Sequence, residues 1–216
     1  MKSRITEFLK ENKSFLLLLI LMFVFRSSFA DWNTVPTSSM KPTILIGDRI
    51  LVNKMAYDIR LPFTHVSLFK ISDPERGDII IFDSKVSNKK LVKRVIGLPG
   101  DIIQLKNNVL YINGEELLYE DVALSDMTTD RIENLLGMEH FVRVKKTGTI
   151  MSSFLPVKVP EGFYLALGDN RDNSADSRVI GFVPRKEIVG RSRSVVMSLN
   201  YENYYIPRTD RFFHTL

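Results

Sequence analysis

Three hydroxyl side chains stand together early in the chain, where one of them could act as a nucleophile. Thr37, Ser38 and Ser39 lie between Pro36 and Pro42. A reactive serine needs a base within hydrogen-bonding reach, and it needs donors for the oxyanion, which a backbone N–H and a neighbouring hydroxyl can supply. The same residue types are also common in turns and helix caps. Spacing alone does not choose between Ser38 and Ser39.

A lysine inside an apolar run is the best candidate for the base. Residues 91–96 read as a strand, in which alternation places Lys93 on one face with Leu91 and Val95, and Arg94 on the other. If Lys93 faces the interior, burial disfavours its charged form and lowers its pKa from about 10.4. A neutral lysine can then act as a general base. The alternative is an edge strand whose lysine reaches solvent.

Histidine and metal chemistry have little support in the sequence. His65, His140 and His214 are the only histidines, and none stands near other catalytic-type residues. The usual serine triad requires a histidine, and a metal site requires several ligands at coherent spacing. The chain has no cysteine, which excludes disulfides and thiol catalysis. We therefore predict no metal and no cofactor.

A second polar segment, residues 168–178, is dense in Asp, Asn, Ser and Arg. Such loops often serve folding through internal hydrogen bonds. Calcium binding is another interpretation, but the loop lacks the glycine and the terminal glutamate of an EF-hand pattern. Its polar density nevertheless indicates more than a simple connection.

The segment before the hydroxyl cluster has the pattern of a membrane anchor. Residues 15–25 are uninterrupted apolar, and the charged residues before them are mainly basic, four against two acidic. A helix over 14–32 would rise roughly 28 Å, close to the hydrocarbon thickness of about 30 Å, with Trp32 at the far interface. Arg26, near the helix end, can carry its guanidinium toward headgroups. We predict a cytoplasmic basic tail over 1–13, a transmembrane anchor over 14–32 and an extracytoplasmic domain over 33–216.

A cleavable signal peptide is the alternative interpretation of this segment. Ser28 and Ala30 are small residues at the two positions that such a cleavage site requires. A mature chain that starts at Asp31 would contradict the anchor.

The charge balance favours a lipid surface over nucleic acid. The net charge is +5, but the 30 basic residues are spread among 25 acidic ones, so no block of positive charge is present. We expect an anionic phospholipid surface as a partner and no nucleic acid. With 216 residues the chain has room for one domain of ordinary size and a terminal appendage.

Short apolar and β-branched runs separated by turn residues predict a mainly β domain after residue 32. The predicted strands cover residues 78–82, 91–96, 102–106, 109–112, 115–118, 162–167 and 193–199. Asn107-Asn108 and Asn113-Gly114 are predicted hairpin turns. One helix is expected over 130–136, with Asp130 as N-cap and Gly137 as stop. Residues 104–160 carry no cluster of reactive side chains, so we expect a non-catalytic elaboration there.

Four blocks of the chain form an ordered pattern after the apolar segment. They cover residues 36–43 with Gly47-Asp48, then 76–82, 93–101 and 168–178. Together they resemble the conserved boxes of bacterial type I signal peptidases, which are serine-lysine peptidases. The resemblance covers about 35–101 and 161–190. It implies an antiparallel β-sheet catalytic domain with an inserted β-rich subdomain, preceded by one transmembrane helix.

The resemblance also implies roles for single positions. Ser39, the residue before the motif's methionine, matches the nucleophile, and Lys93 matches the general base. Thr37 matches a hydroxyl that assists the Ser39 N–H in the oxyanion hole. Ser174 matches a serine that positions the lysine amine.

Other positions match the scaffold and the substrate pocket of the family. The implied supporting ion pairs are Asp176 with Arg178 and Asp169 with Arg94. The implied lining of shallow pockets for small side chains, as in an Ala-x-Ala site, is Val35, Ile44, Ile50, Ile81, Leu91 and Val92. Branched aliphatic side chains leave volume for a methyl group and exclude larger groups.

The implied activity is removal of N-terminal signal peptides from exported preproteins at the outer face of the bacterial cytoplasmic membrane, near the secretion machinery. Many Gram-negative members have two N-terminal transmembrane segments where this chain shows one, and some have a disulfide that this chain cannot form. Two alternatives keep Ser39 and Lys93: a maturation peptidase with one dedicated substrate, and a relative of self-cleaving repressors. A third, from another class, is an inactive anchored β domain that binds secreted proteins.

Overall fold

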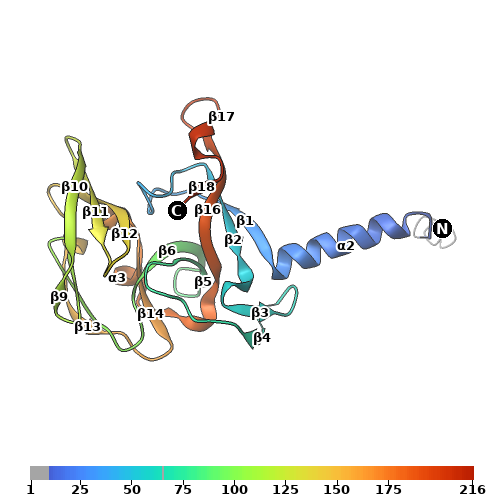
Figure 1. Cartoon of the computed structure of the whole chain (residues 1–216), viewed down its shortest axis with the longest axis horizontal. Coiled ribbons are helices and arrows are strands. Elements are labelled where there is room, and N and C mark those ends of the chain that lie inside the picture. Colours follow the sequence, from blue (N-terminus) through green and yellow to red (C-terminus); the bar gives the residue numbers. More distant parts are fainter. Residues whose placement is uncertain (1–9, 65) are drawn as a thin grey trace.

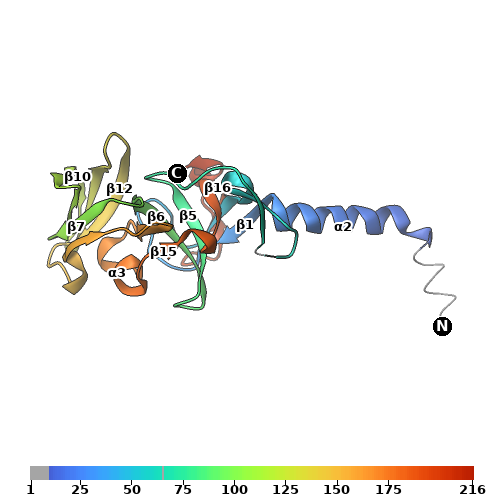
Figure 2. The same cartoon turned by 90° about the horizontal axis from the view of Figure 1, so that it is seen from below.

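A long helix and a mainly β body make up this chain, whose computed structural model describes residues 10–64 and 66–216. Helix α2 (Lys13–Ser28) projects away from the body in both views (Figures 1 and 2). The main sheet has the order β1-β2-β16-β5-β6-β14-β15, and β17 and β18 pair with β16. Its strands are β1 (Ala30–Thr34), β2 (Asp48–Asn53), β5 (Ile79–Ser84), β6 (Lys89–Gly97), β14 (Phe163–Leu167), β15 (Val183–Pro184), β16 (Ile188–Asn200), β17 (Ile206–Pro207) and β18 (His214–Thr215).

Three smaller sheets complete the body, and all the strand pairs are antiparallel. One is the hairpin of β3 (Asp58–Arg60) and β4 (Ser67–Lys70). The others are β7 (Ile102–Lys106), β8 (Val109–Ile112), β9 (Glu115–Glu116) and β13 (Phe154–Lys158), and then β10 (Leu118–Leu124), β11 (Thr128–Asn134) and β12 (Glu139–Lys145). These last two sheets form the insert between β6 and β14, and they lie at the end of the body remote from α2 (Figure 1). The expected mainly β fold with a β-rich insert is confirmed.

The hairpins of the insert follow their turn residues. β7 and β8 have the predicted bounds, 102–106 and 109–112. Asn107 and Asn108 have φ of 50° and 61°, and Asn113 and Gly114 have φ of 54° and 88°. Asparagine and glycine tolerate this left-handed backbone, which two-residue hairpin turns require. Local chemistry therefore fixed these turns.

The helix predicted over 130–136 is wrong. Residues 128–134 form β11, which pairs with β10 on one side and β12 on the other. Thr129 and Glu133, which lie on the same face of this strand, are buried. Asp130 therefore caps no helix; its carboxylate binds Arg143 across the sheet, at 2.6 Å and 2.7 Å. Pairing with strands outside the segment overrode its local preference.

The predicted anchor over 14–32 differs from the observed helix at its end. α2 stops at Ser28, and Trp32 lies in β1, paired with Leu51 of β2. The Lys54 ammonium ends the helix by donating to the carbonyls of Arg26 and Ser27, at 2.8 Å and 3.3 Å, where a cation is favoured. Across residues 10–64 and 66–216, none of the helices meets the length and hydropathy usually required of a membrane span. Residues 1–9, most of the predicted tail, lie outside the described residues.

The main sheet is covered on both faces. Ile79 and Ile81 of β5 pack into one buried cluster, and Ile80 and Phe82 pack into another. Alternation sends successive residues to opposite faces, so β5 and its neighbour β6 lie between two apolar layers. A third cluster fills the insert and reaches Ile96 of β6. A polar side chain in the middle of β6 is consequently removed from water.

Candidate active site

Lys93 lies in the interior of the main sheet. β6 pairs with β5 on one side and β14 on the other, and Lys93 stands opposite Ile80 in the register. Lys93 is only 2% exposed. The edge-strand alternative is therefore wrong, because both neighbouring strands and two apolar layers shield this position.

The Lys93 amine reaches the hydroxyl cluster. Its Nζ donates a hydrogen bond to Ser39 Oγ over 2.7 Å. Burial is the main reason that the pKa of Lys93 is lowered to about 8. The charges of Asp176 and Asp169 act in the opposite direction and raise this pKa, and the charge of Arg178 lowers it. The geometry thus separates Ser39 from Ser38, whose Oγ instead accepts a hydrogen bond from Asn173.

The loop between β1 and β2 carries Ser39 and closes on itself. Gly47 N–H donates to the Val35 carbonyl, and Val35 N–H donates to the Asp48 carbonyl. Gly47 has φ of +93°, and a Cβ there would lie 2.0 Å from the Leu199 carbonyl oxygen, so only glycine fits. Met40, the residue after Ser39, is buried. These contacts hold the Ser39 backbone next to β6.

Thr37 lies in exposed backbone two residues before Ser39. Within residues 10–64 and 66–216, neither the Thr37 hydroxyl nor the Ser39 N–H has a hydrogen-bond partner. Both groups are free to donate to a substrate. Two unpaired donors near a serine hydroxyl meet the chemical requirement of an oxyanion hole.

Asp169 joins β6 to the nucleophile loop. Its carboxylate accepts from Arg94 Nε and Nη2, at 2.9 Å and 2.8 Å, and from Thr43 Oγ1 at 2.6 Å. Burial alone would raise the pKa of Asp169, but the charge and hydrogen bonds of Arg94 bring it below its ordinary value. The sequence-based pair of Asp169 with Arg94 is therefore brought together, and Thr43 is a partner that the sequence analysis missed.

Asp176 and Arg178 also meet. Arg178 Nε and Nη2 donate to the two carboxylate oxygens of Asp176, at 2.8 Å and 2.7 Å. Asp176 further accepts from the Gly168 N–H over 3.0 Å. The pair therefore fastens the start of the 168–178 loop to the first turn of the short helix α3 (Ser177–Ile180).

Ser174 lies close to the dyad without a hydrogen bond to it. A Cβ at Gly168 would lie 2.2 Å from Ser174 Oγ and 2.4 Å from the Ser39 carbonyl oxygen, so both groups pack directly against this glycine. The Ser174 hydroxyl is buried and has no hydrogen-bond partner in the described part of the chain. In this arrangement Lys93 Nζ binds Ser39 Oγ alone.

Asn170 is a second contact that the sequence analysis missed. Its backbone N–H donates to the Ser39 carbonyl over 3.0 Å, and its side-chain Nδ2 donates to the Ser38 carbonyl over 3.0 Å. The only signal in the sequence was the polar density of the 168–178 loop. Through Asn170 this loop holds the backbone of Ser38 and Ser39 directly.

The predicted pocket residues divide between two apolar layers. Five of them pack together in the cluster that also contains Met40, namely Val35, Ile44, Ile50, Ile81 and Val92. Leu91 packs instead in the cluster on the other side of β5. All but Leu91 and Val92 are buried.

The two histidines that the structure describes make no contact with Ser39 or Lys93. His140 is buried beside Glu133, at 3.3 Å, His214 lies in β18, and His65 is outside the described residues. Across residues 10–64 and 66–216, no group of three or more His, Cys, Asp or Glu side chains is arranged to hold a metal ion.

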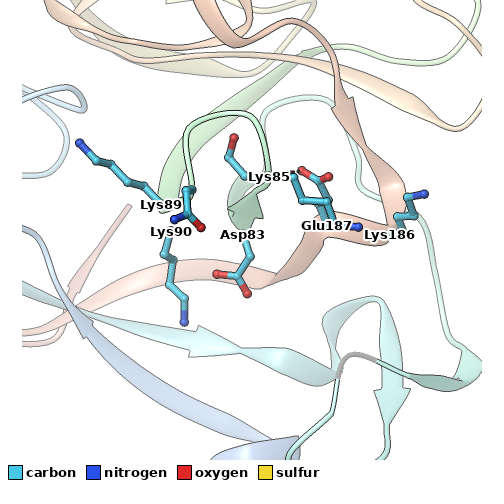
Figure 3. Close-up of a pocket in the computed structure, with 8 residues that line it drawn as sticks. Asp83, Lys85, Lys89, Lys90, Lys186 and Glu187 are labelled. Carbon is cyan, nitrogen blue, oxygen red and sulfur yellow. Dashed lines mark hydrogen bonds between the residues drawn. The ribbon is translucent and has the colours of Figure 1, made fainter.

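A separate hollow of about 660 Å³ lies where the β5–β6 hairpin meets the segment before β16. Four lysines line it, namely Lys85, Lys89, Lys90 and Lys186, together with Asp83 and Glu187. The Lys89 and Lys90 side chains point in different directions (Figure 3). None of the lining residues belongs to the site around Ser39, so this hollow is a basic surface feature and not part of the dyad.

Comparison with known proteins links this chain to one family. The family model described as signal peptidase, peptidase S26, matches residues 6–197. The signal peptidase I of Pseudomonas aeruginosa is 39% identical over 203 residues, covering 87% of this chain and 72% of the relative. That of Bacillus licheniformis is 36% identical, covering 87% and 88%. A crystal structure of a signal peptidase I from Enterococcus faecalis is 33% identical and covers 56% of this chain and 98% of its own, with a TM-score of 0.37.

Proposed function

This chain belongs to the signal peptidase family, whose activity is the removal of signal peptides, and from that premise we propose that Ser39 is its nucleophile and Lys93 its general base. One observation carries the proposal: Lys93 Nζ lies 2.7 Å from Ser39 Oγ. Lys93 is buried, and its pKa is lowered to about 8. A base of this pKa accepts a proton readily near neutral pH.

The proposed reaction is acyl transfer to Ser39. Neutral Lys93 takes the proton of Ser39 Oγ as that oxygen bonds to the scissile carbonyl carbon. The Ser39 N–H and the Thr37 hydroxyl donate to the resulting oxyanion. The C–N bond then breaks as Lys93 returns the proton to the leaving amine, and water, activated by the same lysine, hydrolyses the acyl-enzyme. Ser174, packed near Ser39, stays the candidate for positioning the amine.

Specificity for small residues is proposed to come from the aliphatic cluster that contains Met40, the residue after Ser39. Val35, Ile44 and Ile50 are buried within it, and Val92 is the residue before Lys93. Rigid branched side chains leave a shallow depression that accepts a methyl group and rejects larger side chains. Leu91, on the other side of β5, is a weaker candidate for this lining.

Cleavage of a model preprotein by the detergent-solubilised full chain tests the dyad. We expect cleavage after the small residue of an Ala-x-Ala site, and its loss in Ser39→Ala and in Lys93→Ala. Ser38→Ala is the matched control, because it removes a neighbouring hydroxyl that binds Asn173 and not Lys93. A Lys93→Ala variant that cleaves at near-normal rate would refute the proposal.

The same chain is proposed to be held in the bacterial cytoplasmic membrane by α2. The apolar side chains of α2 are exposed on every side, with Phe15, Leu17, Leu18, Ile20, Leu21, Met22, Phe23 and Phe25 between 46% and 63% exposed. A helix that is apolar all round needs an apolar surrounding. Arg26, at its end, pairs with Asp31 at 2.6 Å and lies 4.3 Å from the Trp32 ring, so its charge is satisfied at the expected interface.

The β3–β4 ribbon (residues 58–64 and 66–71) supports this orientation. It exposes a row of large apolar side chains: Ile59, Leu61, Phe63, Val66, Leu68, Phe69 and Ile71. Phe63 N–H donates to Ser27 Oγ over 2.6 Å, which ties the ribbon to the end of α2. An apolar surface of this kind marks a membrane or protein contact. We propose that it lies on the outer leaflet.

The basic hollow of Figure 3 is proposed to face anionic headgroups. Lys90 lines both this hollow and a smaller one formed by Ser27, Lys54 and Phe63 at the end of α2. Lys90 therefore places the basic hollow next to the apolar surface of the β3–β4 ribbon. Vesicle flotation checks this: binding should rise with anionic lipid, and a Lys85→Gln, Lys89→Gln, Lys186→Gln triple variant should lose that dependence. Nearness to the secretion machinery follows from the shared membrane.

The alternatives differ in substrate range. A maturation peptidase with one dedicated substrate would cleave a single preprotein of a panel, whereas the proposed enzyme would cleave most of those with small residues before the cut. An inactive anchored β domain would bind preproteins and cleave none. The intact contact between Lys93 and Ser39 favours an active enzyme.

A further inference from the structure

The insert makes a buried ionic contact with the loop that supports Ser39. Glu133 of β11 accepts hydrogen bonds from Arg171 Nη1 and Nη2, at 2.7 Å and 2.6 Å, and both side chains are fully buried. Arg171 belongs to the 168–178 loop, whereas Glu133 belongs to a segment for which the sequence predicted no chemical role. A bidentate, desolvated pair of this kind fixes geometry strictly.

Glu133 is built into the insert on all sides. Tyr119 Oη of β10 donates to its Oε2 over 2.5 Å, and His140 Nε2 of β12 lies 3.3 Å from its Oε1. Each strand of the three-stranded sheet thus contributes one residue to the group that holds Arg171. The carboxylate cannot move independently of that sheet.

The next residue of the loop, Asp172, is held in the same way. Its carboxylate accepts four hydrogen bonds of 2.7 Å to 2.8 Å. The donors all come from the insert, and they are Asn108 Nδ2, the Lys145 N–H, Thr149 Oγ1 and Ser152 Oγ. Two successive residues of the loop are therefore bound by residues 108–152.

Other groups of the same loop contact the surroundings of the proposed dyad. Asn170 N–H donates to the Ser39 carbonyl, and the Arg171 carbonyl accepts from Arg178 Nη2 at 2.5 Å. Arg178 in turn pairs with Asp176, whose charge acts on Lys93. A displacement of Arg171 would therefore shift both the Ser39 backbone and the charged groups around Lys93.

We propose that the insert is a required part of the catalytic apparatus, and that Glu133 is a positioning residue that acts through Arg171 to set the Ser39–Lys93 geometry. The proposal rests on the proposed dyad. It gives residues 104–160 a function that their sequence did not indicate: they hold the 168–178 loop against the nucleophile loop, and so keep water away from the Lys93 amine.

Glu133→Gln tests this, with Glu139→Gln as the matched control on the exposed surface of the same sheet. Gln keeps the size of Glu133 but leaves Arg171 without a counter-charge. We expect kcat for a model preprotein to fall about 10- to 100-fold, as for misplaced catalytic groups, with KM little changed. The acid limb of kcat/KM should move from about 8 toward the ordinary lysine value of 10.5. Glu139→Gln should match the parent chain in both respects.

A second readout needs no activity. NMR titration of lysine labelled at 13Cε, with the Lys93 signal identified by its absence in Lys93→Met, gives the Lys93 pKa in each variant. A raised Lys93 pKa in Glu133→Gln supports the positioning role even where the parent chain fails to cleave preprotein, which would count against the proposed function instead. An unchanged kcat and an unchanged Lys93 pKa in folded Glu133→Gln would overturn the inference.

Tyr119→Phe is the milder variant if Glu133→Gln does not fold. It removes one hydrogen bond to Glu133 and retains the charge. We expect shifts in the same directions and of smaller size, in kcat and in the Lys93 pKa. A folded Tyr119→Phe variant with the parent values of both would contradict the proposal.

Discussion

Two neighbouring basic residues of β6, Lys93 and Arg94, are both removed from water and yet have different kinds of partner. Arg94 makes two hydrogen bonds to Asp169 and one to the Gly77 carbonyl. Lys93 makes one hydrogen bond, to the neutral hydroxyl of Ser39. The two buried side chains therefore differ in their partners: Arg94 has a counter-ion, and Lys93 has a neutral hydroxyl.

The chemistry of the two side chains explains the division. A guanidinium stays charged at any ordinary pH, and its planar fork matches a carboxylate. Burial therefore requires a counter-ion for Arg94, and Asp169 supplies it. An ammonium can instead lose its proton when desolvated. Lys93 has no ion pair, and burial lowers its pKa to about 8, which is what the proposed role as a base requires.

The largest expected effect is the loss of catalysis when Lys93, which has no ion pair, is replaced. Lys93→Met, which keeps the length of the side chain but no basic nitrogen, should lower kcat/KM for preprotein by at least about 10³-fold, comparable to Ser39→Ala. The double variant should be no worse than either single variant, because the two groups act as a unit. Additive losses would mean that they do not act together.

The next largest expected effect is the loss of stability when Arg94 is deprived of its ion-pair partner, Asp169. Asp169→Asn should leave the Arg94 charge uncompensated and lower the free energy of unfolding by about 3–5 kcal/mol, as for other buried pairs broken on one side. Urea denaturation in detergent measures this. Replacing both residues, as Arg94→Met with Asp169→Leu, should recover part of the loss. A loss below about 1 kcal/mol in Asp169→Asn would show that water reaches the pair.

Replacement of Lys93 should change the free energy of unfolding in the opposite direction and stabilise the folded state. The folded pKa of Lys93, about 8, lies below the value of 10.5, so below pH 8 the folded state bears the cost of a buried charge. That cost is of order 3 kcal/mol, and it disappears as the pH rises from 8 to 10.5. Lys93→Met should therefore raise the free energy of unfolding at pH 7, with a gain that vanishes above pH 10.5. A less stable Lys93→Met at pH 7 would contradict this.

The smallest effect is the pH dependence of the parent chain. Only neutral Lys93 can accept the Ser39 proton, so kcat/KM should fall about tenfold for each unit below pH 8. The profile of kcat/KM reports the free enzyme and can be measured with a peptide substrate. A rate that is constant from pH 6 to pH 8 would mean that Lys93 is not the titrating base.

Local chemistry decides the parts of the structure that could be predicted correctly from the sequence. The asparagine and glycine turns at 107–108 and 113–114 fixed two hairpins, because few other residues adopt a positive φ. The prediction was wrong at residues 130–136, where a capping pattern indicated a helix and the chain forms β11. The two partner strands of β11 are contributed by residues 118–124 and 139–145, and no local pattern specifies such pairing.

The site divides in the same manner. The order of the boxes selected Ser39 and Lys93, and the structure brings these two side chains to 2.7 Å. Sequence reasoning did not find Thr43, Asn170 or Glu133. Their side chains are ordinary in type, and they become significant only through contacts with residues far along the chain. The separation is 126 residues between Thr43 and Asp169, 132 between Asn170 and Ser38 and 38 between Glu133 and Arg171.

By itself, the sequence determined the class of protein, the apolar helix, the hairpin turns and the residues that carry the proposed chemistry, because each of these depends on residue type or on spacing of a few positions. Tertiary structure alone decided that β6 is an interior strand, so that Lys93 is desolvated while Arg94 is paired. It also decided that the insert forms hydrogen bonds with the 168–178 loop beside Ser39. Desolvation and ion pairing depend on which distant groups fold against a side chain, and that information is not present in its neighbours along the chain.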